Sequence, residues 1–374
     1  MKKPYPLYGM IVITTILFCL VNVLCSTQKN NEIEIQIDSI LQEFNSSDSP
    51  GAAIMVIKDG KSVFQKGYGL ATTTTKIDEY TNFRLASVSK QFTAMCVMIL
   101  KERGRLSYEN TLKDIFPDFP EYGKDITIKN LLNHTSGLID YENLMPDTQT
   151  VQVHDKDVLD MMMSIDSTYF SAGEKYKYSN SGYALLAMIV EKVSGKRYAD
   201  FLKENIFNPL NMKESVAYEK GISEIKNRAL GYIYREDKFI ERDQSSTSAV
   251  LGDGGIYCSL EDYKKWDEAL YINKIVSQET LKEAFTQTLL NDKSVINYGF
   301  GWETSFIDGI NILEHNGSTC GFTNHVIRIP EKRLTVLILT NRYGVEKITE
   351  YCTAIANIFA DGLFTNDPRE RNRY

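Results

Sequence analysis

A lysine stands where the sequence predicts a buried, apolar helix. The stretch FRLASVSKQFTAMCVMILKERG is almost wholly apolar from Phe92 to Leu100, yet it carries Lys90 near its start. Burying a lysine is unfavourable unless its charge is compensated or its proton is lost. Ser87 comes three residues earlier, on the same helical face. A serine beside a lysine of lowered pKa can act as an oxygen nucleophile at neutral pH.

The Ser-x-x-Lys pattern is weak by itself, because the chain contains it three times, at Ser26/Lys29, Ser87/Lys90 and Ser223/Lys226. Only the copy at Ser87 begins a long apolar helix, where free N–H groups and the macrodipole favour negative charge on the serine oxygen. The alternative is structural. Ser87 or Ser89 would cap the helix and Lys90 would extend to solvent.

A second candidate segment is YKYSNSGYALLAMIVEKVSG, in which a polar turn precedes an amphipathic helix. Tyr178 and Asn180 lie in the turn and can project into a cleft. A nearby lysine cation lowers the pKa of a phenol, so a Tyr178 phenolate is a feasible base. The alternative is that Ser179, Asn180 or Ser181 only caps the helix.

A third segment, EHNGSTCGF at residues 314–322, is expected between two strands. Gly317 would let a substrate approach the backbone, and a strand edge offers unpaired N–H groups. The alternative is an ordinary hairpin with an exposed His315. The segments LLNHTSGL and LGDGGIYCSLEDYKKW are interpreted as tight turns whose polar residues hold loops rather than contact substrate.

The elements that position these segments are expected at both ends of the chain. A helix in IEIQIDSILQEFN and a hairpin across Asp59-Gly60 precede the serine, and strands around Asp308-Gly309 and a last helix end the pattern. Between them lie mainly short helices and loops. The simplest assembly is an α+β fold. One antiparallel sheet, flanked by terminal helices, adjoins a mainly helical lobe, and the active site lies in the cleft between them.

The N-terminus predicts export. Lys2 and Lys3 precede the apolar run Ile11–Leu24, about 14 residues long, which is typical of a secretory signal and short for a membrane span. Cys25 closes the run as a lipid-modified cysteine would, so attachment to a membrane through the N-terminus stays open. The domains expected are a signal peptide or anchor at 1–25, a main domain at 32–362 (α/β lobe about 32–104 and 290–362, helical lobe about 105–289) and a polar tail at 363–374.

Composition excludes some partners. The net charge of −7 argues against a nucleic-acid binder, since no broad basic surface is available for phosphates. The four histidines include no pair at helical metal-ligand spacing, so neither a metal site nor a cofactor is expected. Cys96 falls within the apolar helix, where a free buried thiol is the simplest expectation.

The combination of segments is more specific than any one of them. Ser87-x-x-Lys90, YSNSGY and HNG, in this order, resemble the serine β-lactamase and penicillin-binding protein superfamily. The similarity is greater to the class C β-lactamase-related hydrolases and D-alanyl-D-alanine carboxypeptidases, which show motifs like those at 134–138, 178–195, 252–266 and 298–302. The resemblance covers roughly residues 32–362.

This resemblance implies a role for each site residue. Ser87 would be the nucleophile, and Lys90 and Tyr178 would share the proton transfers. Asn180 would bind the substrate amide or orient Lys90, and the backbone N–H groups of Ser87 and Ser318, beside Gly317, would form the oxyanion hole. His315 replaces the lysine of the Lys-Thr-Gly motif of many β-lactamases. A histidine titrates near neutrality, so its help in binding a substrate carboxylate should fade as pH rises.

The implied activity is that of an exported acyl-serine hydrolase acting on a D-amino-acid peptide, an ester or a related amide, with a small molecule or cell-wall peptide as substrate. One alternative is a class C-like β-lactamase. Another is a non-catalytic receptor for penicillin or peptides, which would not need the complete set of Ser87, Lys90 and Tyr178. An α/β-hydrolase is disfavoured because the chain has no G-x-S-x-G elbow.

Overall fold

The fold was analysed in a computed structural model, which describes residue 28, residues 30–360 and residues 362–364. The predicted signal peptide or anchor at 1–25, with Cys25, and most of the polar tail lie outside the described residues. No helix within the described ranges is both long enough and apolar enough to span a bilayer.

A six-stranded antiparallel sheet unites the two ends of the chain, as predicted. Its strand order is β10-β11-β12-β13-β1-β2. The Asp59-Gly60 turn joins β1 to β2, and the Asp308-Gly309 turn joins β10 to β11. The strands are β1 (Ala52–Lys58), β2 (Lys61–Tyr68), β10 (Glu303–Ile307), β11 (Ile310–Thr319), β12 (Phe322–Ile329) and β13 (Leu334–Thr340).

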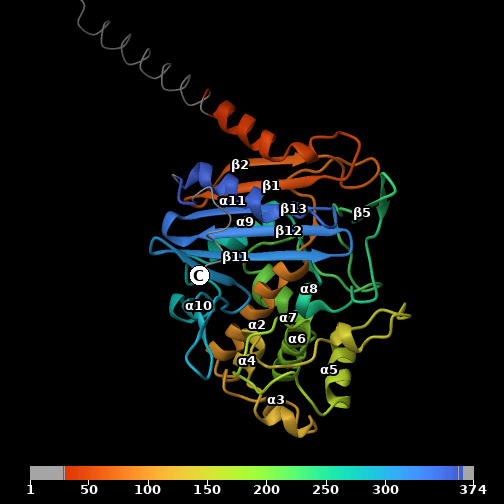
Figure 1. The fold of residues 1–374 in the computed structure, drawn as a ribbon, viewed down its shortest axis with the longest axis vertical. Coiled ribbons are helices and arrows are strands. Elements are labelled where there is room, and N and C mark those ends of the chain that lie inside the picture. The colour runs from red at the N-terminus through yellow and green to blue at the C-terminus, as the bar shows by residue number, and fades with distance from the viewer. Residues whose placement is uncertain (1–27, 29, 361, 365–374) are drawn as a thin grey trace, which may run out of the picture.

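Both faces of the sheet are covered, which explains why β1 and β13 are apolar without alternation. One set of alternate residues, including Ile54 and Val56, packs under helical residues 30–40 and α11 (Ile348–Phe359). The opposite set, including Met55, packs against the larger core. Figure 1 shows α11 across one face of the sheet and α9 (Leu260–Ala269) behind it.

Between β2 and β10 the regular structure is mainly helical, and these helices gather below the sheet in Figure 1. The α-helices are α2 (Lys90–Glu102), α3 (Leu112–Ile115), α4 (Ile128–Leu132), α5 (Asp155–Ser164), α6 (Asn180–Ser194), α7 (Tyr198–Leu202), α8 (Leu251–Gly254) and α10 (Gln278–Ala284). The 3₁₀ turns are η1 (Gln42–Phe44), η2 (Ala86–Ser89), η3 (Glu121–Lys124), η4 (Tyr141–Leu144) and η6 (Pro330–Lys332), and η5 (Lys203–Phe207) is a π-helical turn.

The middle of the chain also contains short strands, which the sequence analysis did not predict. Strand β3 (Phe83–Arg84) pairs with β7 (Ile256–Cys258), and β7 pairs with β4 (Val216–Ala217). Two small hairpins complete the strands, β5 (Tyr232–Arg235) with β6 (Lys238–Glu241) and β8 (Thr288–Leu289) with β9 (Val295–Ile296). The β3–β7 pair matters for the site because β3 leads directly into η2.

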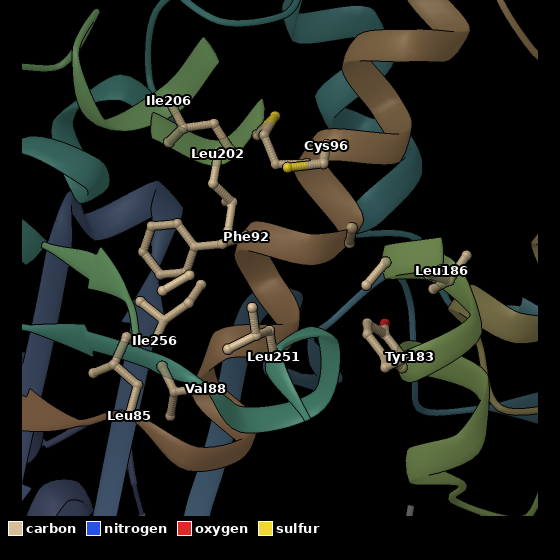
Figure 2. Close-up of a cluster of buried hydrophobic side chains, with 14 of the residues drawn as sticks. Leu85, Val88, Phe92, Cys96, Tyr183, Leu186, Leu202, Ile206, Leu251 and Ile256 are labelled. Carbon is tan, nitrogen blue, oxygen red and sulfur yellow. The ribbon is translucent and has the colours of Figure 1, made fainter. Parts of the chain in front are cut away.

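The helix that carries Lys90 is the centre of the larger core. Every residue of α2 from Lys90 to Leu100 is buried, and Cys96 is a buried free thiol, as predicted. The Phe92 ring stacks on Trp266 with centroids 4.4 Å apart. Figure 2 shows side chains from α6, α7, α8 and β7 around this helix. Burial of apolar area on all sides therefore fixes the position of α2.

Candidate active site

Ser87 lies in a strained turn between β3 and α2. The residue before it, Ala86, has φ of 51°, a left-handed conformation that residues with a Cβ rarely adopt. Strain of this kind persists only where the surrounding structure enforces it, and it is frequent at functional sites. Here the enforcing contacts are the β3–β7 pairing and the approach of β11. The Ser87 side chain is half-buried, so it retains access to solvent.

Lys90 is fully buried, and its ammonium group has three acceptors. Nζ donates to Ser87 Oγ at 3.1 Å, to Asn180 Oδ1 at 2.9 Å and to the Asp253 carbonyl at 2.9 Å. These acceptors match the three protons of an ammonium group. Burial is the largest influence and lowers the pKa of Lys90, although acidic neighbours oppose it. When Lys90 loses a proton, its lone pair can accept the proton of the Ser87 hydroxyl.

Tyr178 lies beside Lys90, with Lys90 Nζ 4.9 Å from the ring centroid. The predicted lowering of the phenol pKa is wrong. Burial raises the pKa of Tyr178, and the nearby Ser87 hydroxyl offsets this only in part. Desolvation of the phenolate outweighs the attraction of a lysine that is itself buried and easily deprotonated. At neutral pH Tyr178 is therefore a protonated phenol, suited to donate a proton rather than to begin as the base.

Asn180 is the first residue of α6 and is held from two sides. Its backbone N–H donates to Asp140 Oδ2 at 2.8 Å, and its Nδ2 donates to Glu142 Oε1 at 3.4 Å. The amide oxygen is therefore left to accept from Lys90. Of the two roles implied for Asn180, orienting Lys90 is the one that these contacts support.

His134, in the segment interpreted as a loop support, lies under Tyr178. It is buried, has φ of 60°, and its Nδ1 accepts the backbone N–H of Ser179 at 3.2 Å. Its ring centroid is 4.2 Å from that of Tyr178. Burial holds the pKa of His134 well below its ordinary value. A neutral imidazole thus fixes the start of α6 and the floor beneath the phenol.

The HNG segment lies on β11, but the burial and the pKa of the His315 imidazole differ from those that the sequence predicts. The side chain is buried, its Nδ1 donates to the Asn316 carbonyl at 2.6 Å, and its Nε2 accepts from Tyr298 Oη at 2.8 Å. Burial, then the Lys90 charge, lowers the His315 pKa to about 3. The expectation of an imidazole titrating near neutrality is therefore wrong, and this position holds no fixed positive charge at neutral pH.

Position 317 requires a glycine, but for a different reason from the predicted approach of a substrate. A Cβ at this position would lie 2.2 Å from the Leu85 carbonyl oxygen. The space is filled by the chain leading to Ser87 rather than left for a substrate, so Gly317 allows β11 to lie directly against η2. Ser318 follows on an exposed part of β11.

The structure therefore places Lys90 in hydrogen-bond contact with both Ser87 and Asn180, with Tyr178 against the lysine and β11 beside η2. Sequence reasoning missed Asp253, Tyr298, Asp140 and Glu142 as partners of the site residues, because only the fold brings these distant segments together. Two surface cavities, of 390 and 230 Å³, are lined by other residues and include none of the predicted site residues. Within the described ranges, no group of three or more His, Cys, Asp or Glu side chains is placed to hold a metal ion.

The antiparallel sheet and the helices beneath it form the fold of the serine β-lactamase and penicillin-binding protein superfamily. The chain belongs to the Beta-lactamase family, whose model matches residues 37–356. The superfamily and fold predicted from the motifs are therefore confirmed, and the family is one of serine hydrolases and acyl-transferases.

Known relatives cover most of the chain. Penicillin-binding protein 4* of Bacillus subtilis (strain 168) is 36% identical over 330 residues, which is 83% of this chain and 72% of that protein. The octameric penicillin-binding protein homologue from Pyrococcus abyssi has a TM-score of 0.75 at 26% identity, covering 91% of this chain and 80% of that one. The D-amino acid amidase of Ochrobactrum anthropi SV3 has a TM-score of 0.73 at 23% identity, covering 89% and 97%, and shares the fold.

Proposed function

We propose that the chain is an acyl-serine hydrolase that forms an acyl-enzyme on Ser87 with a D-amino-acid peptide, amide or ester. The observation that carries the proposal is the buried Lys90 Nζ, 3.1 Å from Ser87 Oγ, with its pKa lowered by burial. A lysine that loses its proton readily and touches the serine can act as its general base. A protein that only binds peptides would not need this contact.

The proton transfers follow from the contacts. Neutral Lys90 takes the Ser87 proton as the oxygen attacks the carbonyl carbon. Tyr178, protonated at neutral pH, gives its proton to the leaving amine or alcohol and is reprotonated from Lys90. Backbone N–H groups of Ser87 and Ser318 are proposed to bind the oxyanion, each worth about 3–4 kcal/mol in such sites. Water then hydrolyses the ester bond to Ser87.

The neutral, buried His315 bears on the choice of substrate. Carboxypeptidase substrates and β-lactams carry a carboxylate, and this position supplies no cation to bind it. We therefore favour amides and esters of D-amino acids over peptides with a free carboxylate, and both over efficient turnover of β-lactams. The fold shared with a D-amino acid amidase is consistent with this choice.

The test is intact mass spectrometry and turnover of purified protein lacking residues 1–25. Substrates are D-phenylalanine amide, its L-isomer, p-nitrophenyl acetate and benzylpenicillin. We expect turnover of the D-amide over the L-amide and an acyl adduct with the ester, both lost in Ser87→Ala. The matched control is Ser223→Ala, which changes another Ser-x-x-Lys serine and should remain active.

The same experiment separates the alternatives. Rapid consumption of benzylpenicillin would identify a β-lactamase. A lasting penicilloyl adduct without turnover of any amide or ester would favour a receptor. No adduct and no turnover with any of these compounds would contradict the acyl-serine mechanism.

We also propose that the protein is exported, because the charged start and the apolar run Ile11–Leu24 are typical of a signal. Expression of the full chain followed by cell fractionation and N-terminal sequencing tests this. Full-length protein confined to the cytoplasm would contradict it, and a lipid mass on Cys25 would identify the anchor.

A further inference from the structure

The turn α8 holds an acidic residue that the mechanism above leaves without a role. Asp253 is buried, and its carbonyl and its carboxylate each accept a hydrogen bond. Its main-chain carbonyl accepts from Lys90 Nζ at 2.9 Å. Its carboxylate Oδ2 accepts from Tyr141 Oη at 3.0 Å. Burying a carboxylate and a lysine side by side costs free energy, because both charges lose their hydration, and this cost must be compensated by interactions within the fold.

The turn is held rigidly by three helices. The Asp155 carboxylate, at the start of α5, accepts the N–H groups of Leu251 at 2.8 Å and Gly252 at 2.9 Å. Thr93 Oγ1, on α2, donates to the Gly252 carbonyl at 2.7 Å. A Cβ on Gly252 would lie 2.3 Å from the Tyr183 carbonyl of α6. Asp253 is therefore fixed relative to Lys90 by contacts that leave the turn little freedom.

We propose that Asp253 is a positioning residue that controls the protonation of Lys90. Its carbonyl holds the ammonium group beside Ser87, and its carboxylate supplies the counter-charge within the core. The consequence for catalysis rests on the proposed acylation of Ser87. The effect of Asp253 on the charge of Lys90 is independent of that proposed function.

The charge on Asp253 opposes the effect of burial on Lys90. Burial lowers the pKa of Lys90, and the Asp253 carboxylate is the largest of the influences that raise it. Other charged or titratable groups from each neighbouring element also face the pair. They are Arg84 on β3, His134 after α4, Asp140, Tyr141 and Glu142 at η4, Asp155 on α5, Tyr178 and Tyr183 at α6, Tyr198 on α7 and His315 on β11. Removing the Asp253 charge should thus let Lys90 lose its proton at a lower pH.

The variant Asp253→Asn isolates the charge. Its backbone carbonyl still accepts from Lys90, and its amide oxygen can still accept from Tyr141. The matched control is Asp262→Asn, which removes another buried carboxylate, one on α9 that accepts the N–H groups of Glu214 and Ser215. A second variant, Tyr141→Phe, serves in case Asp253→Asn fails to fold. Burial raises the pKa of Asp253 to about 7, and the Tyr141 hydrogen bond favours the ionised carboxylate, so removing that bond leaves a smaller fraction of Asp253 charged near neutrality.

The direct readout is NMR titration of Lys90 in protein labelled with ¹³C-lysine, assigned with Lys90→Met, and it needs no activity. We expect the midpoint of Lys90 to fall by about one pH unit in Asp253→Asn, by less in Tyr141→Phe, and not in Asp262→Asn. The second readout is the pH profile of the p-nitrophenol burst from p-nitrophenyl acetate. Its acidic limb should move to lower pH by the same amount.

The outcomes distinguish the two proposals. An unmoved or raised Lys90 midpoint in Asp253→Asn and Tyr141→Phe would overturn the inference whether or not the protein is an enzyme. A lowered midpoint in a protein that gives no burst would support the control of Lys90 by Asp253 and contradict the proposed function. A lowered midpoint with an unmoved acidic limb would also overturn the link between Lys90 and catalysis.

Discussion

His315 should make the folded chain more sensitive to acid, and His315→Gln should remove the part of that sensitivity that this imidazole causes. The imidazole is 2% exposed and neutral, since Nδ1 donates to Asn316 and Nε2 accepts from Tyr298. Its pKa is lowered to about 3 in the fold, against about 6.5 for an unfolded chain. Protonation below pH 6.5 thus favours the unfolded state. This contribution to stability is complete above pH 6.5 and is lost as pH falls toward 3.

The difference in pKa sets the size of the effect. Each pH unit below about 6.5 lowers the free energy of unfolding by up to about 1.4 kcal/mol, so the loss due to His315 is about 2 kcal/mol at pH 5. Glutamine has an amide that can replace the bond to Tyr298 but takes up no proton. The stability gap between wild type and His315→Gln should therefore narrow by about 2 kcal/mol from pH 7 to pH 5. Buried His134 contributes equally to both proteins and cancels in this comparison.

Urea denaturation followed by tryptophan fluorescence is a suitable assay, because Trp266 and Trp302 are both buried and should report global unfolding. The matched control is His154→Gln, which removes a histidine whose side chain is 66% exposed. The difference in the free energy of unfolding between His154→Gln and wild type should stay the same from pH 7 to pH 5. A gap between wild type and His315→Gln that is constant from pH 7 to pH 5 would refute the assignment of a neutral, buried imidazole.

Three further substitutions test the site. Lys90→Met should slow acylation of Ser87 by about 10³-fold or more, measured by burst kinetics, and circular dichroism should show that the chain stays folded. A burst rate close to that of wild type would exclude Lys90 as the base. Tyr178→Phe should slow cleavage of an amide by about 10²-fold but that of a p-nitrophenyl ester by less than tenfold, because only the amine leaving group needs a proton. Equal losses would argue against proton donation. Gly317→Ala should lower stability by about 1–3 kcal/mol and reduce activity, since its methyl group would meet the Leu85 carbonyl; an unchanged melting temperature would contradict the close packing of β11 on η2.

Much of the fold could be predicted because its determinants are local. The turn residues Asp59-Gly60 and Asp308-Gly309 fix two hairpins, and apolar strands at both chain ends have few other places to pair. The proximity of Ser87 and Lys90 was also predictable, since three residues separate them. Even here the local geometry differs from the prediction. Ser87 lies in the turn η2, and the α-helix begins at Lys90.

The protonation states could not be predicted, because they depend on burial by distant segments. The sequence places a lysine near Tyr178 and predicts a phenolate, but the fold buries both groups and raises the phenol pKa. It gives His315 an ordinary imidazole, but β11 turns that ring into the core against Tyr298. The relevant quantity is the cost of desolvating a charge, and a linear pattern of residue types does not contain it.

The same dependence on burial explains why the site needs a carboxylate that no local pattern marks as functional. Burial alone would favour a neutral Lys90 that loses its ammonium contacts to Ser87 and Asn180. A full counter-ion beside it would favour a permanent ammonium group, which cannot act as a base. Asp253 lies in a turn held by Asp155, and its carboxylate accepts from Tyr141. Burial raises the pKa of Asp253 to about 7, so it supplies a buried charge of intermediate effect. A base that must both orient a serine and accept its proton needs a pKa between these two extremes. In this chain burial lowers the pKa of Lys90 and Asp253 raises it, from a turn 163 residues away in the sequence.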